Sequence, residues 1–393
     1  MGEWLSIIGI GEDGPAGLSE ASRDALAAAE VVFGGPRHLA MIAHPDKRAW
    51  PVPFSLAPLL ALRGRRVAVL ASGNPFWHGA GGSIARQIGP GEWRAFPAPS
   101  VFSRAAAQMG WRLEETPCIG LHAAPHERLR PHLAPGQRLI VTLRDGAAPQ
   151  ALAEWLAEMG FGASLVTVLE RLGGPSARIR ATRADGFDLA DITAPVAAAI
   201  EVAGAGRVLT RASGLADDFF EHDGQITKRP VRALALSALA PRPGEMLWDL
   251  GAGSGSVGIE WLLAHPAMRA VGVESDATRA ARARANAARL GCDRLEIREG
   301  RALDVLPALP RPDAVFVGGG MEENLLNALW ACLPGGTRLV VHGVTLETEA
   351  LLASWHGAKG GQMLRIELAE AAPLGRRRGW KSAYPVVQWS VTR

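Results

Sequence analysis

The sequence is poor in cysteine, which argues against two kinds of stabilised fold. It has three cysteines in 393 residues, Cys118, Cys292 and Cys332, and no two of them form a CxxC pair. An odd, scattered set argues against a disulfide framework and lacks the ligand spacing of a zinc site. His122 and His126 are four residues apart, but a proline between them and the lack of a third ligand favour a loop. We therefore predict no metal site and a reducing, cytoplasmic compartment.

Long apolar runs and a strong excess of charge are also missing. No apolar run reaches the roughly 18 residues needed to span a membrane, and the N-terminus lacks the basic and apolar regions of a secretory signal. Lys plus Arg number 42 against 39 for Asp plus Glu, so the net charge is only +3. We therefore expect neither a membrane protein nor a nucleic-acid binder.

The remaining composition is that of an ordinary globular protein. Hydrophobic residues make up 48% and charged residues 21% of the chain, which is typical of folded proteins. A chain of 393 residues is long for one domain and comfortable for two, each with its own core.

Strands and helices are predicted to alternate along both halves, which indicates an α/β architecture. In the first half, apolar runs predict strands at 5–9, 31–33, 66–70, 138–143 and 164–169, with helices at 19–29 and 150–159. In the second half, a helix is expected at 231–239 and strands at 246–250, 269–273, 294–298, 314–317, 337–341, 363–368 and 386–391. The periodicity fades between about 204 and 224, so we place a linker there and predict domains at 1–206 and 207–393.

A glycine-rich motif at 249–256 gives the strongest functional signal. Gly251, Gly253 and Gly255 follow a predicted strand and precede an apolar helix, where glycines let the backbone approach a ligand closely. Glu274 ends the next strand, where a carboxylate can accept two ribose hydroxyls. Asp249, before the first glycine, favours S-adenosylmethionine over NAD. No Lys-Ser/Thr pair follows, which excludes a Walker A loop, and the serines lack the glycines of a nucleophile elbow.

The second half resembles the decarboxylating precorrin methyltransferases of cobalamin biosynthesis, which have a seven-stranded Rossmann-like fold. The resemblance covers about 210–393 and uses the motifs at 224–228, 248–256, 299–302, 316–320, 334–336 and 344–348. It implies that the cofactor is lined by Thr227, Gly251, Gly253, Gly255, Glu274 and Ala302. Arg301 stands where the family often has an acidic residue, so backbone groups around Ala302 are expected to bind the adenine.

The first half contains Gly9-Ile10-Gly11-Glu12-Asp13-Gly14, a GxGxxG pattern after a strand. A dinucleotide fold would need an acid closing the second strand, whereas Glu30 precedes that strand. The segment at about 3–203 instead resembles the two-lobed tetrapyrrole methylases, through residues 8–14, 71–75, 97–100, 121–122 and 141–142. That resemblance implies S-adenosylmethionine bound in the cleft between the lobes, largely through backbone groups. The residues that it points to are Gly73, Asn74, Ser100, Val101, Leu121 and Thr142.

Two basic clusters are candidates for binding the carboxylates of a tetrapyrrole substrate. Lys228 and Arg229 follow the 224–228 motif, and Arg376 and Arg377 lie in a late segment expected to be a loop. Guanidinium groups bind carboxylates bidentately. An exposed basic loop without this role is an equally good interpretation.

Together the resemblances imply one enzyme that methylates a precorrin at C5 with its first half. Its second half would methylate C15 and decarboxylate the C12 acetate side chain. Each half would use its own S-adenosylmethionine, and no general acid or base can be assigned. Two alternatives remain: methylation of RNA, or one half that binds cofactor without catalysis. We expect a homo-oligomer. Whether the substrate carries cobalt, and in which order the steps occur, stay open.

Overall fold

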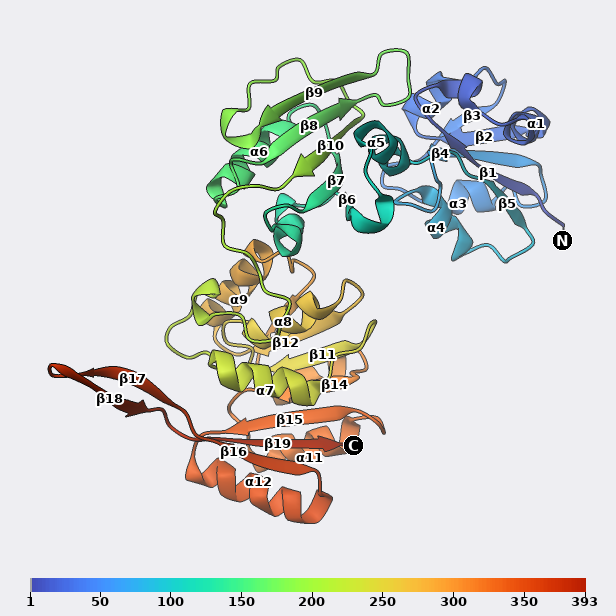
Figure 1. Ribbon diagram of the computed structural model, residues 1–393. Helices are drawn as coiled ribbons and strands as arrows, with labels where there is room; N and C mark the ends of the chain where they lie inside the picture. The colour runs from blue at the N-terminus through green and yellow to red at the C-terminus, as the bar shows by residue number, and fades with distance from the viewer. Residues whose placement is uncertain (1) are drawn as a thin grey trace. The chain divides into compact units, whose positions relative to one another are not determined.

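The computed structural model describes residues 2–393, and the chain divides into two compact units. The first unit extends to His126 and resumes from His132 to Arg207, and the second comprises Glu127–Pro131 and Val208–Arg393. Figure 1 shows the elements of both, coloured from blue at the N-terminus to red at the C-terminus. Within residues 2–393, no helix has both the length and the apolar character needed to cross a membrane.

The elements before residue 208 form two lobes of α/β structure, apart from η3, most of which belongs to the second unit. They are β1 (Leu5–Ile10), η1 (Gly14–Gly17), α1 (Glu20–Ala28), β2 (Val31–Gly34), α2 (Pro36–Ala40), β3 (Lys47–Ala49), α3 (Ala57–Leu60), β4 (Val67–Ser72), α4 (Ala80–Ala85), β5 (Trp93–Phe96), α5 (Val101–Met109), η2 (Leu113–Glu115), β6 (Cys118–Gly120), η3 (His126–His132), β7 (Arg138–Leu143), α6 (Ala148–Glu158), β8 (Leu165–Glu170), β9 (Arg178–Arg183), η4 (Ala184–Gly186) and β10 (Val196–Glu201).

The first lobe is built on a parallel sheet with the order β3-β2-β4-β1-β5. Its central strands are mostly apolar, as expected for a sheet covered on both faces. Successive residues serve opposite faces: Ile7 packs in one apolar cluster and Ile8 in the other. The carboxyl ends of β1 and β4 therefore meet at one edge, where ligands bind in open parallel sheets.

The second lobe contains a mixed sheet with the order β6-β7-β10-β8-β9. β6 runs parallel to β7, and the other pairs are antiparallel. Helix α5 covers one face, because Phe102, Ala105 and Ala106 are buried against Ile140 and Leu169 of the sheet. The helix starts at Ser100, whose hydroxyl accepts a hydrogen bond from the Ser103 amide at 3.1 Å. This N-cap lies next to the candidate site described below.

The second unit is a three-layer structure around one seven-stranded sheet. Its elements are η5 (Asp217–Phe219), α7 (Arg229–Leu239), β11 (Met246–Leu250), α8 (Ser256–Ala264), β12 (Arg269–Glu274), α9 (Ala277–Arg289), β13 (Glu296–Glu299), α10 (Ala302–Val305), η6 (Leu306–Ala308), β14 (Ala314–Val317), α11 (Glu323–Cys332), β15 (Arg338–Gly343), α12 (Leu346–Lys359), β16 (Gln362–Ile366), β17 (Ala369–Leu374), β18 (Arg377–Ser382) and β19 (Val386–Thr392). The sheet order is β13-β12-β11-β14-β15-β19-β16, with only β19 antiparallel to its two neighbours.

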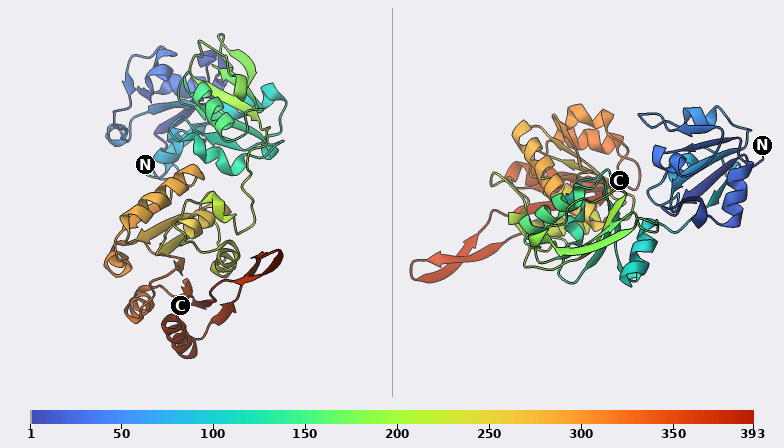
Figure 2. Two further views of the ribbon diagram at one scale, coloured as in Figure 1. Left: turned by 90° about the vertical axis from the view of Figure 1, so that its left-hand side faces the viewer. Right: turned by 90° about the horizontal axis from the view of Figure 1, so that it is seen from above.

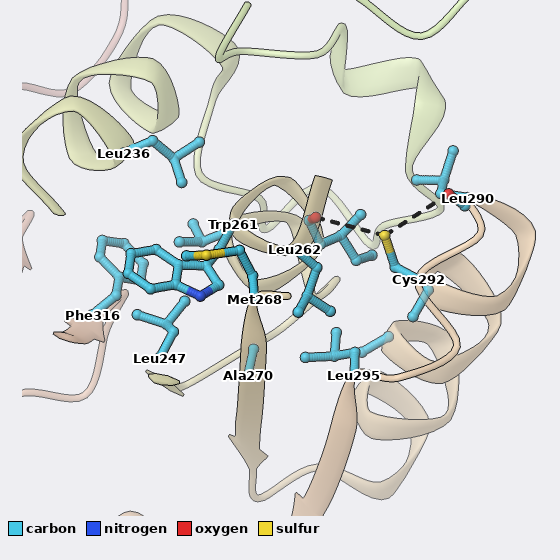
Figure 3. Close-up of a cluster of buried hydrophobic side chains, with 14 of the residues drawn as sticks. Leu236, Leu247, Trp261, Leu262, Met268, Ala270, Leu290, Cys292, Leu295 and Phe316 are labelled. Atoms are coloured by element: carbon cyan, nitrogen blue, oxygen red, sulfur yellow. Dashed lines mark hydrogen bonds between the residues drawn. The ribbon is translucent and has the colours of Figure 1, made fainter. Parts of the chain in front are cut away.

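Alternation along the strands divides the core of this unit into two halves. Leu247 and Phe316 face helices α7, α8 and α9, whereas Trp248 and Val317 face α10, α11 and α12. Figure 3 shows the first half, in which the fully buried Trp261 packs beside Leu247, Met268 and Phe316. Burial of side chains of this size contributes about 1.5–3 kcal/mol each. A rigid sheet thus supports the loops at its carboxyl edge.

The predicted fold class is confirmed, but two segments differ from expectation. The segment expected to be a linker carries Leu209, Leu215 and Phe220, which are buried in the core of the second unit. The buried residues are single apolar positions spaced along a glycine-rich stretch. The segment therefore shows no hydrophobic periodicity from which this packing could be predicted.

The segment around Arg376 was expected to be a loop and is instead a β-hairpin. Strands β17 and β18 pair antiparallel, with the turn at Gly375 and Arg376. The hairpin extends from the sheet of its own unit into solvent (Figure 2). Its residues are almost all exposed, so no alternation of buried and exposed positions marks it in the sequence.

Candidate functional site

The first unit contains a pocket of about 260 Å³ between its two lobes. Its walls come from the ends of β1, β4 and β7, from the start of α5 and from the start of β10. The lining residues are Ile10, Gly11, Glu12, Arg37, Ser72, Gly73, Trp77, His78, Pro99, Ser100, Val101, Phe102, Arg104, His122, Thr142, Leu143, Leu169, Leu172, Pro195 and Val196. Apolar walls with a few convergent polar groups are typical of a small-molecule site.

Close backbone approach forms the floor of this pocket. A Cβ at Gly9 would lie 1.8 Å from the Gly73 carbonyl oxygen, and a Cβ at Gly73 would lie 2.8 Å from the Pro99 carbonyl oxygen. Gly73 has a φ of +54°, which favours glycine, and its amide donates to the Ile10 carbonyl at 3.0 Å. The backbones of three chain segments therefore pack against one another at the pocket.

The structure brings four of the six predicted residues of this half into the pocket wall. Gly73, Ser100, Val101 and Thr142 line it, whereas Asn74 and Leu121 do not. The Asn74 side chain accepts a hydrogen bond from the Phe76 amide at 3.0 Å, which shapes the loop after β4. Leu121 is buried, and its amide donates to the Thr142 carbonyl at 2.9 Å.

The sequence analysis did not predict the charged residues at this pocket. Glu12 and Asp13 lie inside the GxGxxG pattern, and Arg104 donates to Asp13 at 2.6 Å. Arg37 contacts Glu12 and also donates to the Ser72 hydroxyl at 2.9 Å. The polar positions within that pattern could have indicated these contacts, but their arginine partners are distant in sequence.

Burial and the neighbouring charges lower the pKa of two groups in this region. Burial, and then the positive charge of Arg171, lower the pKa of the Arg37 guanidinium. Burial, and then Arg37, lower the pKa of His38 to about 4, so its imidazole is neutral near pH 7. The His38 Nε2 atom lies 3.0 Å from the hydroxyl of Ser72, which lines the pocket.

The second unit has a pocket of about 170 Å³ at the carboxyl edge of its sheet. The ends of β11, β12, β13 and β14 and the start of α10 enclose it. It is lined by Leu250, Gly251, Val273, Ser275, Gly300, Arg301, Ala302, Leu303, Gly319, Gly320, Glu322 and Leu325. This is the edge of an open α/β sheet at which nucleoside ligands bind.

The glycine-rich turn is held against the end of β12. The amides of Gly251 and Ala252 both donate to the Val273 carbonyl, and the Gly253 amide donates to the Glu274 carboxylate at 2.8 Å. The other Glu274 oxygen accepts from the Asp276 amide at 3.0 Å. A carboxylate has about four acceptor positions, so two remain for ligand hydroxyls.

Asp249 is the most perturbed acid of this unit. Its side chain is fully buried at the end of β11, and one oxygen accepts from the Gly258 amide at 2.9 Å, while the other has no hydrogen-bond partner in residues 2–393. Burial, with a further contribution from the nearby Glu274 charge, raises the pKa of Asp249 to about 7. A protonated Asp249 would reduce the negative charge beneath the glycine-rich turn.

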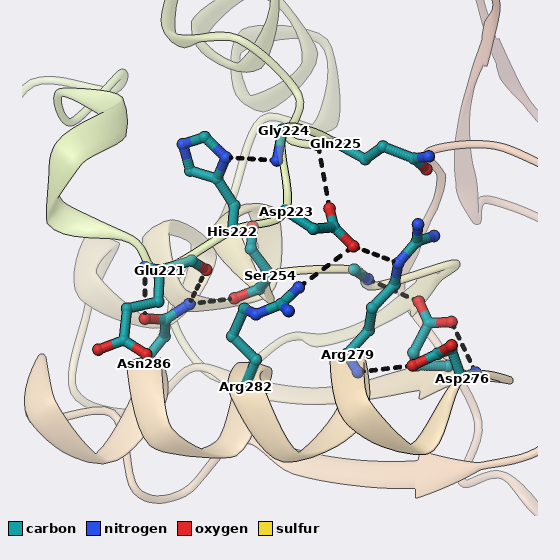
Figure 4. Close-up of polar contacts among 12 residues, drawn as sticks. Glu221, His222, Asp223, Gly224, Gln225, Ser254, Asp276, Arg279, Arg282 and Asn286 are labelled. Carbon is teal, nitrogen blue, oxygen red and sulfur yellow. Dashed lines mark hydrogen bonds and ion pairs between the residues drawn. The ribbon is translucent and has the colours of Figure 1, made fainter.

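A loop from Glu221 to Thr227 is fastened beside the same turn (Figure 4). Asp223 accepts hydrogen bonds from the Gln225 amide at 3.0 Å and from Arg279 of α9 at 2.8 Å. The Gln225 hydrogen bond and then Arg279 lower the pKa of Asp223 to about 2. The Gln225 carbonyl lies 3.9 Å from the position of a Cβ on Gly253, so the loop passes close to the glycines.

Only some of the residues predicted to bind the cofactor in the second half line this pocket. Gly251 and Ala302 line the pocket, whereas Gly253, Gly255, Glu274 and Thr227 are outside its lining. Lys228 and Arg229 are exposed at the start of α7, and Arg376 and Arg377 are exposed on the β17–β18 hairpin. The sequence analysis did not predict the lining residues Ser275 and Glu322, because they belong to no motif of characteristic spacing.

Comparison with known proteins assigns the family. Residues 5–188 match the tetrapyrrole (corrin/porphyrin) methylases, and residues 218–393 match the precorrin methyltransferase domain. The precorrin-6Y C(5,15)-methyltransferase (decarboxylating) of a Sinorhizobium species is 47% identical over 99% of this chain and 96% of that protein. This chain belongs to the precorrin-6Y C5,15-methyltransferase (decarboxylating) family. The resemblances drawn from the motifs are therefore confirmed.

Two further matches are a curated relative and a solved structure. The protein of the same name from Mycobacterium tuberculosis (strain CDC 1551 / Oshkosh) is 41% identical over 99% of this chain and 100% of its own length. A crystal structure of the C-terminal domain of precorrin-6Y C5,15-methyltransferase from Rhodobacter capsulatus is 48% identical, covers 47% of this chain and 100% of that chain, and has a TM-score of 0.46. The family consists of methyltransferases that in general use S-adenosylmethionine. Residues 2–393 contain no group of three or more His, Cys, Asp or Glu side chains arranged to hold a metal ion.

Proposed function

We propose that the chain methylates a precorrin-6 tetrapyrrole at C5 and C15 and removes the C12 acetate carboxyl group as carbon dioxide, giving precorrin-8. The observation that carries this proposal is the match to decarboxylating C5,15-methyltransferases along 99% of the chain. The presence of a pocket in each unit supports the proposal that the two methyl transfers occur at separate sites.

We further propose one S-adenosylmethionine site in each unit. In the second unit, Gly251, Gly253 and Gly255 all have positive φ values, and a side chain at Gly251 would project beside the pocket. The two free acceptor positions of Glu274 suit a pair of ribose hydroxyls. Thr227 and Ala302 complete this proposed site. The bound cofactor would supply an electrophilic methyl group on a sulfonium.

In the first unit, the proposed cofactor contacts come mainly from backbone groups. Gly73, Ser100, Val101 and Thr142 line the pocket, and Asn74 and Leu121 support two of the loops that form it. Trp77 and Phe102 lie with ring centroids 5.2 Å apart at the same wall. Their faces provide an apolar surface suited to the edge of a conjugated macrocycle.

We assign C5 methylation to the domain at 1–206, and C15 methylation with decarboxylation to the domain at 207–393. This division follows the separate families that match the two parts of the chain. Lys228, Arg229, Arg376 and Arg377 are proposed to bind substrate carboxylates in the second domain, as exposed cations with free donors. A homo-oligomer working in the cytoplasm stays a prediction.

The main contribution of the protein to catalysis is to position the reacting groups. A meso carbon between enamine-like pyrrole units is already nucleophilic, so in-line alignment supplies much of the rate enhancement. Loss of carbon dioxide leaves an electron pair that the conjugated macrocycle accepts, as in other electron-sink chemistry. The walls of each pocket would exclude water and orient the carbon acceptor, and no general base is assigned.

Mass spectrometry of the reaction products tests this proposal. The whole chain would be incubated with S-adenosylmethionine and the reduced precorrin-6 substrate under anaerobic conditions. We expect a product with two added methyl groups and one lost carbon dioxide. A tetrapyrrole returned unchanged by a chain that binds S-adenosylmethionine would contradict the substrate assignment and leave the family assignment standing.

A further inference from the structure

Arginines from both lobes of the first unit converge on a single carboxylate at the pocket. Glu12 follows β1, Arg37 lies on α2 of the same lobe, and Arg171 follows β8 of the other lobe. An Arg37 guanidinium nitrogen contacts one Glu12 oxygen, and the Arg171 Nε atom lies 3.6 Å from the other. Only 8% of the Glu12 side chain is exposed, whereas Arg37 is 38% and Arg171 40% exposed. The carboxylate is thus enclosed by guanidinium groups that are themselves accessible.

The backbone is held so that Arg171 points at Glu12. Arg171 has a φ of +47°, a left-handed conformation that is unfavourable for a residue with a Cβ. Its amide donates to the Pro195 carbonyl at 2.8 Å, which fastens this conformation to the start of β10. Strained residues of this kind gather at ligand sites. Gly174 also approaches Glu12 closely, since a Cβ there would lie 2.8 Å from the Glu12 Cβ.

Charge is not balanced at this cluster. Two guanidinium groups share one carboxylate, and the repulsion between them contributes to the lowered pKa of Arg37. The neighbouring Arg104 is neutralised by Asp13 at 2.6 Å, so it does not add to the excess. A second anion would therefore be favoured here. Planar bidentate donors of this kind select carboxylates.

We propose that Arg37 and Arg171, beside Glu12, form a binding site for a carboxylate side chain of the tetrapyrrole in the first unit. The site rests on the proposed function, because that function supplies a substrate rich in acetate and propionate groups. Binding adds a second carboxylate at the accessible faces of the two guanidinium groups and makes no covalent bond. The arginines thereby orient the macrocycle at the pocket wall that also holds Gly73.

A purely structural ion-pair cluster is the competing explanation, and four variants separate the two. Arg171 is not among the residues that line the pocket, so Arg171→Met removes a proposed substrate contact without changing the pocket wall. Arg171→Lys keeps the positive charge but lacks the planar guanidinium group. Glu12→Gln removes the competing charge. Arg63→Met is the matched control, because Arg63 is 39% exposed and pairs with Glu92 away from the pocket.

The kinetic test uses the whole chain with [methyl-13C]S-adenosylmethionine and reduced precorrin-6, with C5 and C15 methylation resolved by NMR. Loss of a charge-assisted contact should raise the tetrapyrrole KM for C5 methylation about 10- to 100-fold in Arg171→Met. The KM for S-adenosylmethionine should not change, Arg171→Lys should recover part of the loss, and Glu12→Gln should lower the tetrapyrrole KM. An unchanged tetrapyrrole KM in Arg171→Met, or a raised KM in Glu12→Gln, would overturn the proposal.

A binding measurement without turnover separates this inference from the proposed function. Uroporphyrin I, an octacarboxylate tetrapyrrole, would be titrated into each variant and followed by quenching of its own fluorescence. If wild type and Arg63→Met bind it and Arg171→Met binds it about 10-fold more weakly, the carboxylate site stands even if precorrin-6 is not methylated. Equal affinity of all variants would refute the site, whatever the outcome of the methylation assay.

Discussion

Glu274 is the residue on which the proposed cofactor site of the second unit depends most. Its two oxygens already accept the Gly253 and Asp276 amides, so the carboxylate is oriented before any ligand arrives. An acceptor held in place in this way loses little conformational freedom on binding. The same hydrogen bonds fix the glycine-rich turn relative to β12.

Replacing Glu274 by Gln should therefore weaken cofactor binding without unfolding the unit. Loss of the charged acceptor is expected to lower the affinity of this site for S-adenosylmethionine about 10- to 100-fold. Isothermal titration of the whole chain measures this. Glu299→Gln is a suitable control, since Glu299 ends the neighbouring strand β13 and pairs with Arg284 in solvent. Equal losses in both variants would refute the role of Glu274.

Asp249 predicts a dependence of stability on pH. Its pKa is raised from 3.8 to about 7 in the folded state, so between these values the native state holds a proton that the unfolded chain has released. Stability from this group is complete below pH 3.8 and is lost as pH rises toward 7, by at most about 1.4 kcal/mol per pH unit.

Asp249→Asn removes this titration. The free energy of unfolding of wild type, minus that of the variant, should fall between pH 4.5 and 7 and become constant above it, as measured by urea denaturation. A difference that stays constant over the whole range would show that Asp249 is ionised in the folded protein at every pH tested.

At the residue scale, residues whose role depends on local backbone geometry were easier to predict from the sequence than residues whose role depends on partners distant in the chain. Gly73 and Gly251 were expected at ligand sites, and both line a pocket. Arg37 and Arg171 were not expected, because they belong to separate lobes and meet only through Glu12. No spacing within one segment can reveal a contact of that kind.

Among the elements, the segment before α7 depends on one buried arginine. Arg232 is fully buried and donates to Glu260 at 2.6 Å and to Asp217 at 3.0 Å. It also donates to the Leu215 and Thr227 carbonyls. One guanidinium thus ties α8 to the segment that leads into the Thr227 loop, which explains why the expected linker is part of the core.

Arg232→Met should destabilise the second unit by about 3–5 kcal/mol, because it leaves the Glu260 charge buried without its partner. Denaturant unfolding of the whole chain, followed by a probe in this unit, measures the loss. Adding Glu260→Gln to this variant should recover part of it. The exposed Arg242→Met should change stability by less than about 0.5 kcal/mol. A loss no larger than that of Arg242→Met would contradict the role of the network.

The loop of Asp223 provides a second prediction at this scale. The low pKa of Asp223 keeps it charged above pH 3.8, and its ion pairs would be lost only as pH falls toward 2. Asp223→Asn should therefore free the loop at neutral pH. We expect faster hydrogen exchange at the amides from Gln225 to Thr227 and several-fold weaker binding of S-adenosylmethionine in this unit. Exchange equal to wild type would show that the loop is held by other contacts.

Central strands with runs of larger apolar residues, such as β4 and β14, were predictable because burial on both faces leaves continuous apolar runs. The central strand β10 was missed, because alanines, which are uncommon in strands, occupy its middle. Peripheral strands such as β9 and β18 were not, because their side chains are mostly exposed and their order comes from pairing with a neighbour. Element boundaries also moved where a capping residue decides them: the helix expected at 19–29 is α1 (Glu20–Ala28), with Ser19 as its N-cap. Local periodicity carries no information about such tertiary contacts.

For the whole molecule, the account depends on two units that each have a core and a pocket of their own. Each pocket lies where the ends of strands meet a helix start or glycine-rich turn, but the folds are different. Two unrelated folds in one chain fit two methyl transfers to different carbons of one substrate. The central claim is therefore one cofactor site in each unit.

The number of S-adenosylmethionine molecules bound per chain, measured by equilibrium dialysis, tests that claim most directly. Gly73→Ala and Gly251→Val should each abolish one site, because Gly73 approaches Pro99 closely and Gly251 lines the second pocket. Gly64→Ala and Gly244→Ala are matched controls with positive φ and open space around them. The account predicts two molecules bound per chain in wild type and both controls and one in each site variant; one molecule in wild type, or two in either site variant, would contradict it.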